Sequence, residues 1–225
     1  MSTRALRSSA EQYIPSGHRD LKVLRESIQD CKGCDLHLSG TQAVFGEGAR
    51  HAEIMMVGEQ PGDKEDQEGR PFVGPAGQLL DRCLELAGIE RSRVYITNVV
   101  KHFKWEPRGK WRIHKKPNAM EIAACRPWFD AELEVVKPKL VVCLGATAAQ
   151  ALLGKAFRVT QRRGELIDLG NSPFFMATIH PSAILRTNDR DSRAAETKML
   201  VEDLKQAALY IEQMQDEQVP SRKFA

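Results

Sequence analysis

The sequence predicts a three-layer α/β/α sandwich around a central, mainly parallel four-stranded sheet. Four short apolar runs, at 54–57, 94–100, 140–145 and 174–179, have the pattern of strands buried on both faces. Segments with helical periodicity alternate with these runs along the chain. This alternation is typical of a parallel sheet covered by helices on both faces, in which ligands bind beyond the carboxyl ends of the strands.

Composition and charge indicate one globular domain. The chain has 225 residues, 42% of them hydrophobic and 28% charged, with a net charge of +3. We expect a single domain over 19–215, between flexible tails at 1–18 and 216–225. The first residues lack the apolar core of a signal peptide, and no apolar run approaches the roughly 20 residues that span a membrane. We therefore expect a cytoplasmic monomer that makes no contact with membranes.

A pair of cysteines follows the first predicted helix, which covers 19–29. Cys31 and Cys34 are two residues apart, so their thiolates can hold one metal centre. A thioredoxin-like redox motif has the same spacing, but it begins a helix after a strand, whereas this pair follows a helix. Cytosolic thiols stay reduced, so the five cysteines of the chain indicate metal or redox chemistry rather than disulfides. An unrelated pair of small residues is the alternative.

The segment 54–77 is the centre of the predicted site. A short strand near 43–45 leads to the apolar run at 54–57, and a loop rich in glycine and proline then precedes a helix at 76–87. Glycines let a backbone approach a ligand closely, and long loops of this kind are usually functional or disordered. The loop carries polar and aromatic side chains at Glu59, Gln60, Asp63, Asp66 and Phe72.

A basic segment follows the second strand. That strand ends near Asn98, whose amide has a donor and an acceptor for the edge of a ring. Residues 101–117 contain seven basic residues against one glutamate, and the rings of Phe103, Trp105 and Trp111 lie among them. Basic groups neutralise phosphates and exposed rings stack on bases, so this segment indicates nucleic-acid binding. A solvated charged loop is the alternative.

The strand ends are expected to bring reactive side chains to one edge of the sheet. Beyond the basic segment we expect helices at 118–136, 146–153 and 191–215, with strands at 140–145 and 174–179 among them. The last strand ends at His180. Two histidines, His114 and His180, would therefore meet Asn98, the loop carboxylates and Phe72 at this edge, which indicates an active site.

Five motifs together resemble the uracil-DNA glycosylase superfamily, in particular its iron–sulfur branch related to family 4. They are GEQPG, RPFVGPAG, TNVVKH, ACRPW and HPSAILR. The segment GKWRIHKKP further resembles the loop of the X-type uracil-DNA glycosylases, whose usual pattern is KRRIH, with Trp111 in place of an arginine. The resemblance covers roughly 31–186. It implies an enzyme that excises uracil from DNA and stays covalently linked through His114 to C1′ of the abasic sugar.

The resemblance also implies how uracil is held. Phe72 would stack on the flipped-out base, and Asn98 would hydrogen-bond its Watson–Crick edge. His180 would donate to the uracil oxygen that becomes anionic as the bond breaks. The backbone of Gly58 and Gly62 would approach the substrate closely.

For the nucleophile, the resemblance points away from water. Gln60 stands where related enzymes have an aspartate that positions a water, and an amide cannot act as a general base. An unperturbed imidazole is largely neutral and nucleophilic at pH 7, so His114 would attack the sugar. Glu59 or Asp63 would orient it or accept its second proton.

The implied partner is uracil-containing DNA, single- or double-stranded. The residues expected to bind it, chiefly through its phosphates, are Lys110, Arg112, Lys115, Lys116, Ser182 and Arg186.

The implied cofactor is a [4Fe-4S] cluster held by Cys31, Cys34, His102 and Cys125. Three thiolates and one imidazole also suit structural zinc, which is the alternative metal. Cys83 and Cys143 are expected in the apolar core.

Two other functions remain open from the sequence. One is a glycosylase with ordinary turnover, in which His114 only positions the DNA strand. The other is a non-catalytic module that binds damaged or single-stranded DNA.

Overall fold

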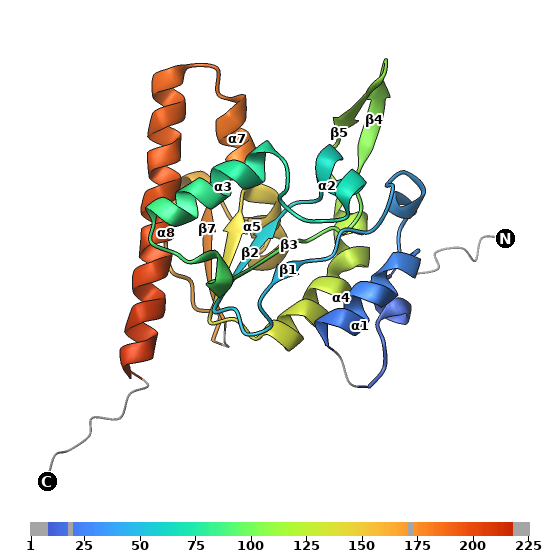
Figure 1. Cartoon of the computed structure of the whole chain (residues 1–225), viewed down its shortest axis with the longest axis horizontal. Helices are drawn as coiled ribbons and strands as arrows, with labels where there is room; N and C mark the ends of the chain where they lie inside the picture. Colours follow the sequence, from blue (N-terminus) through green and yellow to red (C-terminus); the bar gives the residue numbers. More distant parts are fainter. Residues whose placement is uncertain (1–8, 18–19, 171–172, 218–225) are drawn as a thin grey trace, which may run out of the picture.

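The central sheet of the computed structural model has five strands in the order β1-β3-β2-β6-β7 (Figure 1). The parallel strands are β2 (Ile54–Gly58), β3 (Val94–Asn98), β6 (Leu140–Leu144) and β7 (Phe174–Thr178). The predicted class is confirmed, but the predicted number of four strands is wrong. The fifth, β1 (Glu47–Gly48), pairs antiparallel with β3 and is too short to show an alternating pattern in the sequence. The strand expected at 43–45 does not form.

The structure describes residues 9–17, 20–170 and 173–217. Most of the two predicted tails, at 1–8 and 218–225, lies outside these residues. The part of the first tail that is described packs against the domain through a short 3-10 helix, Glu11–Tyr13. Ala10 is buried there, and its N–H donates to the Ala124 carbonyl (2.8 Å).

Helices cover both faces of the sheet. They are α1 (Leu21–Ser27), α2 (Asp63–Glu68), α3 (Pro75–Leu86), α4 (Ala119–Val136), α5 (Ala146–Leu153), α6 (Val159–Arg162), α7 (Pro181–Arg186) and α8 (Arg190–Glu217). Among the helices of the described chain, none has the length and apolar character that crossing a bilayer requires.

Each face of the sheet has its own apolar cluster, because successive side chains of a strand point to opposite faces. Met55 and Val141 belong to the cluster that includes α1, α4 and α5. Met56 and Val142 belong to the cluster that includes α3, α7 and α8. Figure 1 shows α3 and α8 on the side away from α1 and α4. This arrangement makes the three layers and leaves the carboxyl ends of the parallel strands at one edge.

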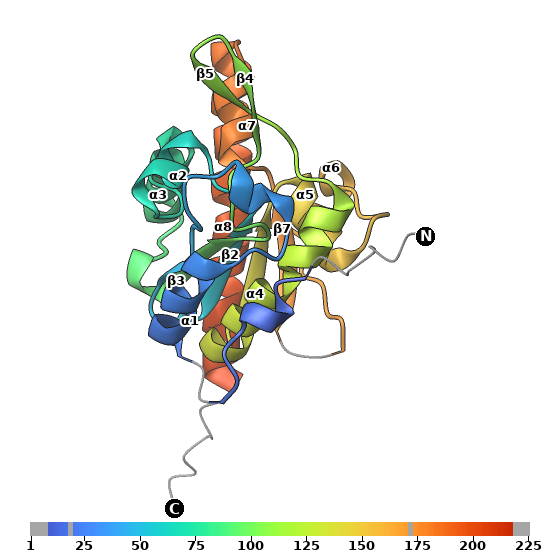
Figure 2. The ribbon, with the colours of Figure 1, turned by 90° about the vertical axis from the view of Figure 1, so that its right-hand side faces the viewer.

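The basic segment, expected as a loop, forms a β-hairpin. Its strands are β4 (Trp105–Arg108) and β5 (Trp111–His114). They stand clear of the rest of the body in Figure 1, and Figure 2 shows them projecting at the same end of the molecule as α7. A two-residue turn joins them, with Gly109 at φ 60°, a left-handed conformation that favours glycine. The hairpin is rich in charge on exposed faces, so the sequence shows no apolar alternation. Helix α2 was likewise not expected, because it lies inside the glycine- and proline-rich loop.

Candidate active site

A cavity of about 700 Å³ lies at the carboxyl ends of the parallel strands. Side chains from at least six separate segments line it, and Glu59, Phe72, Asn98, His114 and His180 are among them. The structure thus brings together the residues that the sequence placed at this edge. Gln60, Gly62, Lys116, Ser182 and Arg186 also line the cavity.

Asn98 sits at the end of β3, directly opposite Gly58 of β2. Its side-chain Oδ1 is buried and has no hydrogen-bond partner, the one such atom within the described residues. A Cβ at position 58 would collide with this oxygen and with the Phe72 ring, so glycine is required for the close approach. An orphaned acceptor in a cavity wall is an incomplete hydrogen bond that a ligand N–H can satisfy.

Phe72 has φ 55°, which is unusual for a residue with a side chain. Its ring stacks beside the His180 ring, with centroids 5.8 Å apart and planes at 28°. Gly77 leaves room for this backbone, because a Cβ there would collide with the Phe72 carbonyl. Buried Glu65 holds the same loop by accepting the Gly74 N–H (2.7 Å). Glu65 was not among the predicted site residues, since its position depends on the unexpected helix α2.

His180 is a neutral hydrogen-bond donor facing the cavity. Its Nδ1 accepts the Ser182 N–H (3.0 Å) at the start of α7, so Nε2 carries the proton. Burial lowers the pKa of His180 to about 4, and the charges of Arg186 and His114 act in the same direction. The imidazole therefore stays neutral at pH 7 and presents one N–H.

His114, at the end of β5, is paired with Glu59. Its Nε2 lies 3.3 Å from Glu59 Oε1, and its side chain is 50% exposed. Asp63, the other carboxylate expected near His114, is engaged elsewhere: it binds Arg112 and accepts from Gln67 (2.9 Å). Glu59 is thus the carboxylate in contact with this imidazole.

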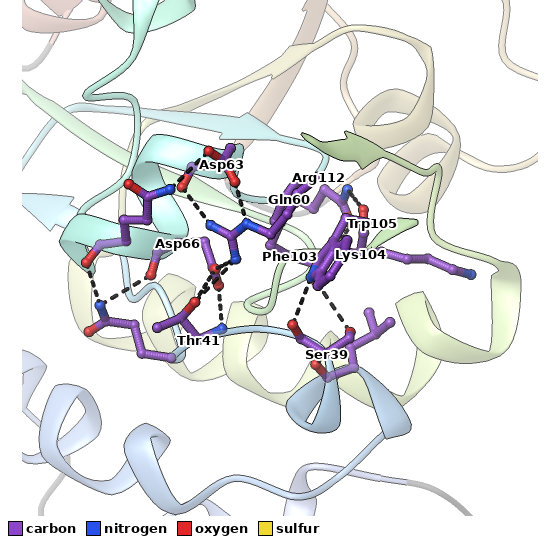
Figure 3. Close-up of polar contacts among 12 residues, drawn as sticks. Ser39, Thr41, Gln60, Asp63, Asp66, Phe103, Lys104, Trp105 and Arg112 are labelled. Atoms are coloured by element: carbon purple, nitrogen blue, oxygen red, sulfur yellow. Dashed lines mark hydrogen bonds and ion pairs between the residues drawn. The ribbon is translucent and has the colours of Figure 1, made fainter. Parts of the chain in front are cut away.

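Gln60 ties both ends of the hairpin to the loop after β2. At one end, which Figure 3 shows, its amide nitrogen donates to the Lys104 carbonyl (3.1 Å) and its oxygen accepts the Lys104 N–H (3.1 Å). At the other end, the amide nitrogen donates to the Lys115 carbonyl (3.2 Å). These bonds occupy the amide of a buried side chain. The sequence assigned Gln60 to the catalytic set, whereas its contacts place it as a support for the segment that carries His114.

Arg112 is a second anchor of the hairpin. Its guanidinium binds Asp63 (2.5 Å) and the buried Asp66 (2.6 Å) of α2, as Figure 3 shows. It also lies over the rings of Phe103 and Trp105, at 5.5 and 5.6 Å from their centroids. Arg112 therefore anchors the hairpin, because two carboxylates already neutralise its charge, and its expected contact with DNA phosphates stays a prediction.

Replacing Arg112 by serine should loosen the hairpin. Because the charged partner Asp66 is buried, we expect the free energy of unfolding to fall by about 1–3 kcal/mol. Urea denaturation measures this loss, and hydrogen exchange should show faster exchange of the β4 and β5 amides. Arg108→Ser is the matched control, since Arg108 is exposed and forms no ion pair within the described residues. Equal effects of the two changes would contradict the anchoring role.

The other predicted DNA contacts are spread along the hairpin and α7. Lys110 lies at the hairpin tip, and Lys115 pairs with Glu106 (2.7 Å) while remaining exposed. Exposed Lys116 and Arg186 line the cavity, and Arg186 donates to the Ser182 hydroxyl (3.2 Å). Of these cations, Lys116 and Arg186 are the two that line the cavity.

Three of the four predicted cluster ligands gather behind the hairpin. Cys31, Cys34 and Cys125 are buried in one apolar cluster, and the charges of Cys31 and Cys34 both act on Cys125. Burial raises the pKa of Cys125 to about 12, opposed by the charge of Lys101. His102 is buried, and burial lowers its pKa to about 4, so its ring is neutral.

The sulfurs already accept hydrogen bonds. Trp128 donates its indole N–H to Cys31 Sγ (3.2 Å), and the Lys101 N–H donates to Cys125 Sγ (3.3 Å). Within the described residues, no three His, Cys, Asp or Glu side chains meet closely enough to hold a single metal ion. Cys83 and Cys143 lie in the apolar clusters, as expected.

Comparisons with known proteins agree with this site. Residues 45–205 match the family model described as the uracil DNA glycosylase superfamily. The chain is 38% identical to the type-4 uracil-DNA glycosylase of Thermotoga maritima over 192 residues, which is 85% of this chain and 94% of that protein. It is 38% identical to a type-4 uracil-DNA glycosylase of Pyrobaculum aerophilum, over 74% of this chain and 85% of the relative. It is 36% identical to the type-4 uracil-DNA glycosylase of Archaeoglobus fulgidus, over 72% of this chain and 81% of the relative.

Proposed function

Since the chain belongs to the uracil-DNA glycosylase superfamily, we propose that it excises uracil from DNA and then becomes covalently linked through His114 to C1′ of the abasic sugar. This behaviour would place it among the X-type enzymes. The observation that carries the proposal is the pairing of His114 with Glu59 at the cavity, in a site where Gln60 cannot act as a base.

Recognition begins with a uracil turned out of the stack into the cavity. Extruding a base costs a few kcal/mol, so mispaired or single-stranded uracil should react most readily. The Phe72 ring supplies a stacking surface, and the uracil N3–H donates to the orphaned Oδ1 of Asn98. The amide nitrogen of Asn98 then faces the O4 carbonyl. Cytosine presents an acceptor at N3 and an amino donor at C4, so it mismatches both groups.

Bond cleavage leaves a negative charge on the base. As the bond between C1′ and the base nitrogen breaks, its electron pair moves onto uracil and the charge is shared with the O2 carbonyl. The Nε2–H of His180 donates to this oxygen, and it is held in place by the bond from the Ser182 N–H to Nδ1. A preoriented donor of this kind stabilises charge as it develops, at no cost of reorganisation.

Capture of the sugar completes the reaction. The ring nitrogen of His114 that carries the free electron pair forms the new bond to C1′, and Glu59 accepts the proton of the other nitrogen. The uracil anion takes a proton from solvent. The product is a neutral imidazole bonded to carbon, which is a poor leaving group, so the adduct should survive heat and detergent.

A denaturing gel with uracil-containing oligonucleotide tests the proposal. A protein–DNA band that survives heat and detergent supports capture by a protein side chain. An abasic product that is cleaved by alkali, without such a band, would identify a glycosylase with ordinary turnover. A shift seen only under native conditions would identify a DNA-binding module without activity.

We also propose that Cys31, Cys34, His102 and Cys125 hold a [4Fe-4S] cluster. The N–H groups that already point at two of the sulfurs support this, because thiolates of such clusters accept hydrogen bonds. When bound, the cluster would fix the segment that begins the hairpin.

The purified protein should be brown and contain about four irons per chain. Cys125→Ala should lose the iron and the colour, which absorbance and metal analysis measure. Cys83→Ala is the matched control, since Cys83 is also buried but lies in the other apolar cluster. Stoichiometric zinc in a colourless, fully active protein would overturn the assignment.

We propose that the enzyme acts in the cytoplasm, as a monomer on single- or double-stranded DNA.

A further inference from the structure

The outer face of the β4–β5 hairpin is open. Side chains alternate along β5, so Arg112 and His114 turn toward α2 and the cavity, whereas Trp111 and Ile113 turn away from them. Trp111 is 67% exposed and Ile113 is 40% exposed. Tryptophan is highly buried on average, so a ring this open is a candidate contact surface.

Of the three rings in the basic segment, Trp111 is the one exposed to solvent. The sequence predicted three exposed rings there, but that expectation is wrong for two of them. Phe103 is buried, and Trp105 donates its indole N–H to the Ser39 carbonyl (2.7 Å), as Figure 3 shows. Both rings lie under the anchor residue Arg112 and hold the hairpin.

The surroundings of Trp111 are positively charged. Lys110 Nζ lies 5.7 Å from its ring centroid, and Arg108 is its partner across the hairpin. Neither cation forms an ion pair with a carboxylate within the described part of the chain. The tip, residues 107–111, contains no acidic residue. Cations without ion pairs can neutralise phosphates, and a ring between them can stack on a base. This combination favours nucleic acid over a protein as the partner of Trp111.

Trp111 is also close to the cavity along the strand. It precedes His114 by three residues, which is about 10 Å in a strand. Successive bases of a stacked strand are about 3.4 Å apart. The backbone of Trp111 therefore lies about three base spacings from His114, which lines the cavity.

We infer that Trp111 stacks on an unpaired base of the DNA strand that carries the uracil, with Lys110 and Arg108 on the adjoining phosphates. This inference rests on the proposed function, in which the uracil is bound in the cavity. Bases in a duplex are covered on both faces by their neighbours, so the platform favours single-stranded DNA. The hairpin thus sets the substrate class as well as presenting His114.

Binding of uracil-free DNA tests the inference without any chemistry. The probes are a labelled single-stranded oligo-dT and the same strand paired with oligo-dA, measured by fluorescence anisotropy. Trp111→Ala should weaken single-strand binding about tenfold or more, the loss that one stacked base implies, and leave duplex binding within about twofold. Trp111→Phe keeps a ring and should stay near the parent affinity. Single-strand binding should also quench tryptophan emission in the parent and not in Trp111→Phe.

Leu209→Ala is the control for an exposed apolar side chain far from the basic segment, and it should change neither affinity. Unchanged single-strand affinity in Trp111→Ala would overturn the inference, as would an equal loss on both DNA forms. A parent dimer that dissociates in Trp111→Ala, with DNA affinity intact, would show that a second copy covers the ring. Since no uracil is present, these results are independent of whether the His114 adduct forms.

Discussion

His114→Ser should abolish the heat-stable adduct and still release uracil. Serine lacks the imidazole that bonds to C1′, whereas Phe72, Asn98 and His180 still bind and stabilise the departing base. The half-exposed position of His114 lets water enter the vacated space. Denaturing gels measure the adduct, and alkaline cleavage of the abasic product measures uracil release. We expect the first to disappear and the second to remain detectable.

The control for this change is His51→Ser, which makes the same substitution at an exposed histidine between β1 and β2. It should leave the adduct unchanged. Glu59→Gln should slow capture more than uracil release, because the amide cannot accept the imidazole proton. If His114→Ser still crosslinks to uracil-containing DNA, another side chain is the nucleophile.

Asn98→Ala should lower uracil excision by about 10²–10³-fold, the usual cost of removing one preoriented polar group from a site. The buried Oδ1 that awaits a donor is lost, and with it the amide that reads the base edge. Single-turnover kinetics on uracil-containing DNA measure the fall. Binding of uracil-free DNA should stay nearly intact, because Asn98 is buried and the basic residues expected to bind phosphates are unchanged.

Asn98→Asp tests the hydrogen bonds of this side chain without changing its size. The side chain keeps its size, but an ionised carboxylate presents an acceptor to the O4 carbonyl where the amide presents a donor. We therefore expect slow excision from this variant too. Comparable excision of uracil and cytosine by the parent protein would show that Asn98 does not select the base.

The sheet and the edge that carries the site were predictable, because they depend on local patterns. Runs such as 140–144 are apolar throughout, since parallel strands are buried on both faces. Their carboxyl ends coincide in space, so Asn98 and His180 could be placed together from strand ends alone. The two-residue β1 carries no such pattern and was missed.

The roles of Gln60 and Arg112 were not predictable. Gln60 bonds to Lys104, 44 residues away, and Arg112 binds Asp66, 46 residues away. No local pattern records such contacts, and charge alone made Arg112 resemble a phosphate ligand. The anchoring role of Arg112 depends on helix α2, and that helix was not expected because it lies in a glycine-rich segment.

The hairpin anchors have a consequence for how this chemistry can arise. Gln60, Asp63 and Asp66 fix the position of the histidine, but none of them holds the base against Asn98 or Phe72. In the proposed reaction, base selection and sugar capture would therefore depend on separate sets of contacts. Under that proposal, an ancestor with ordinary turnover would acquire self-trapping by gaining a hairpin and its anchors, with no change to the base pocket. A descendant that lost one anchor would then return to repeated turnover while keeping its preference for uracil.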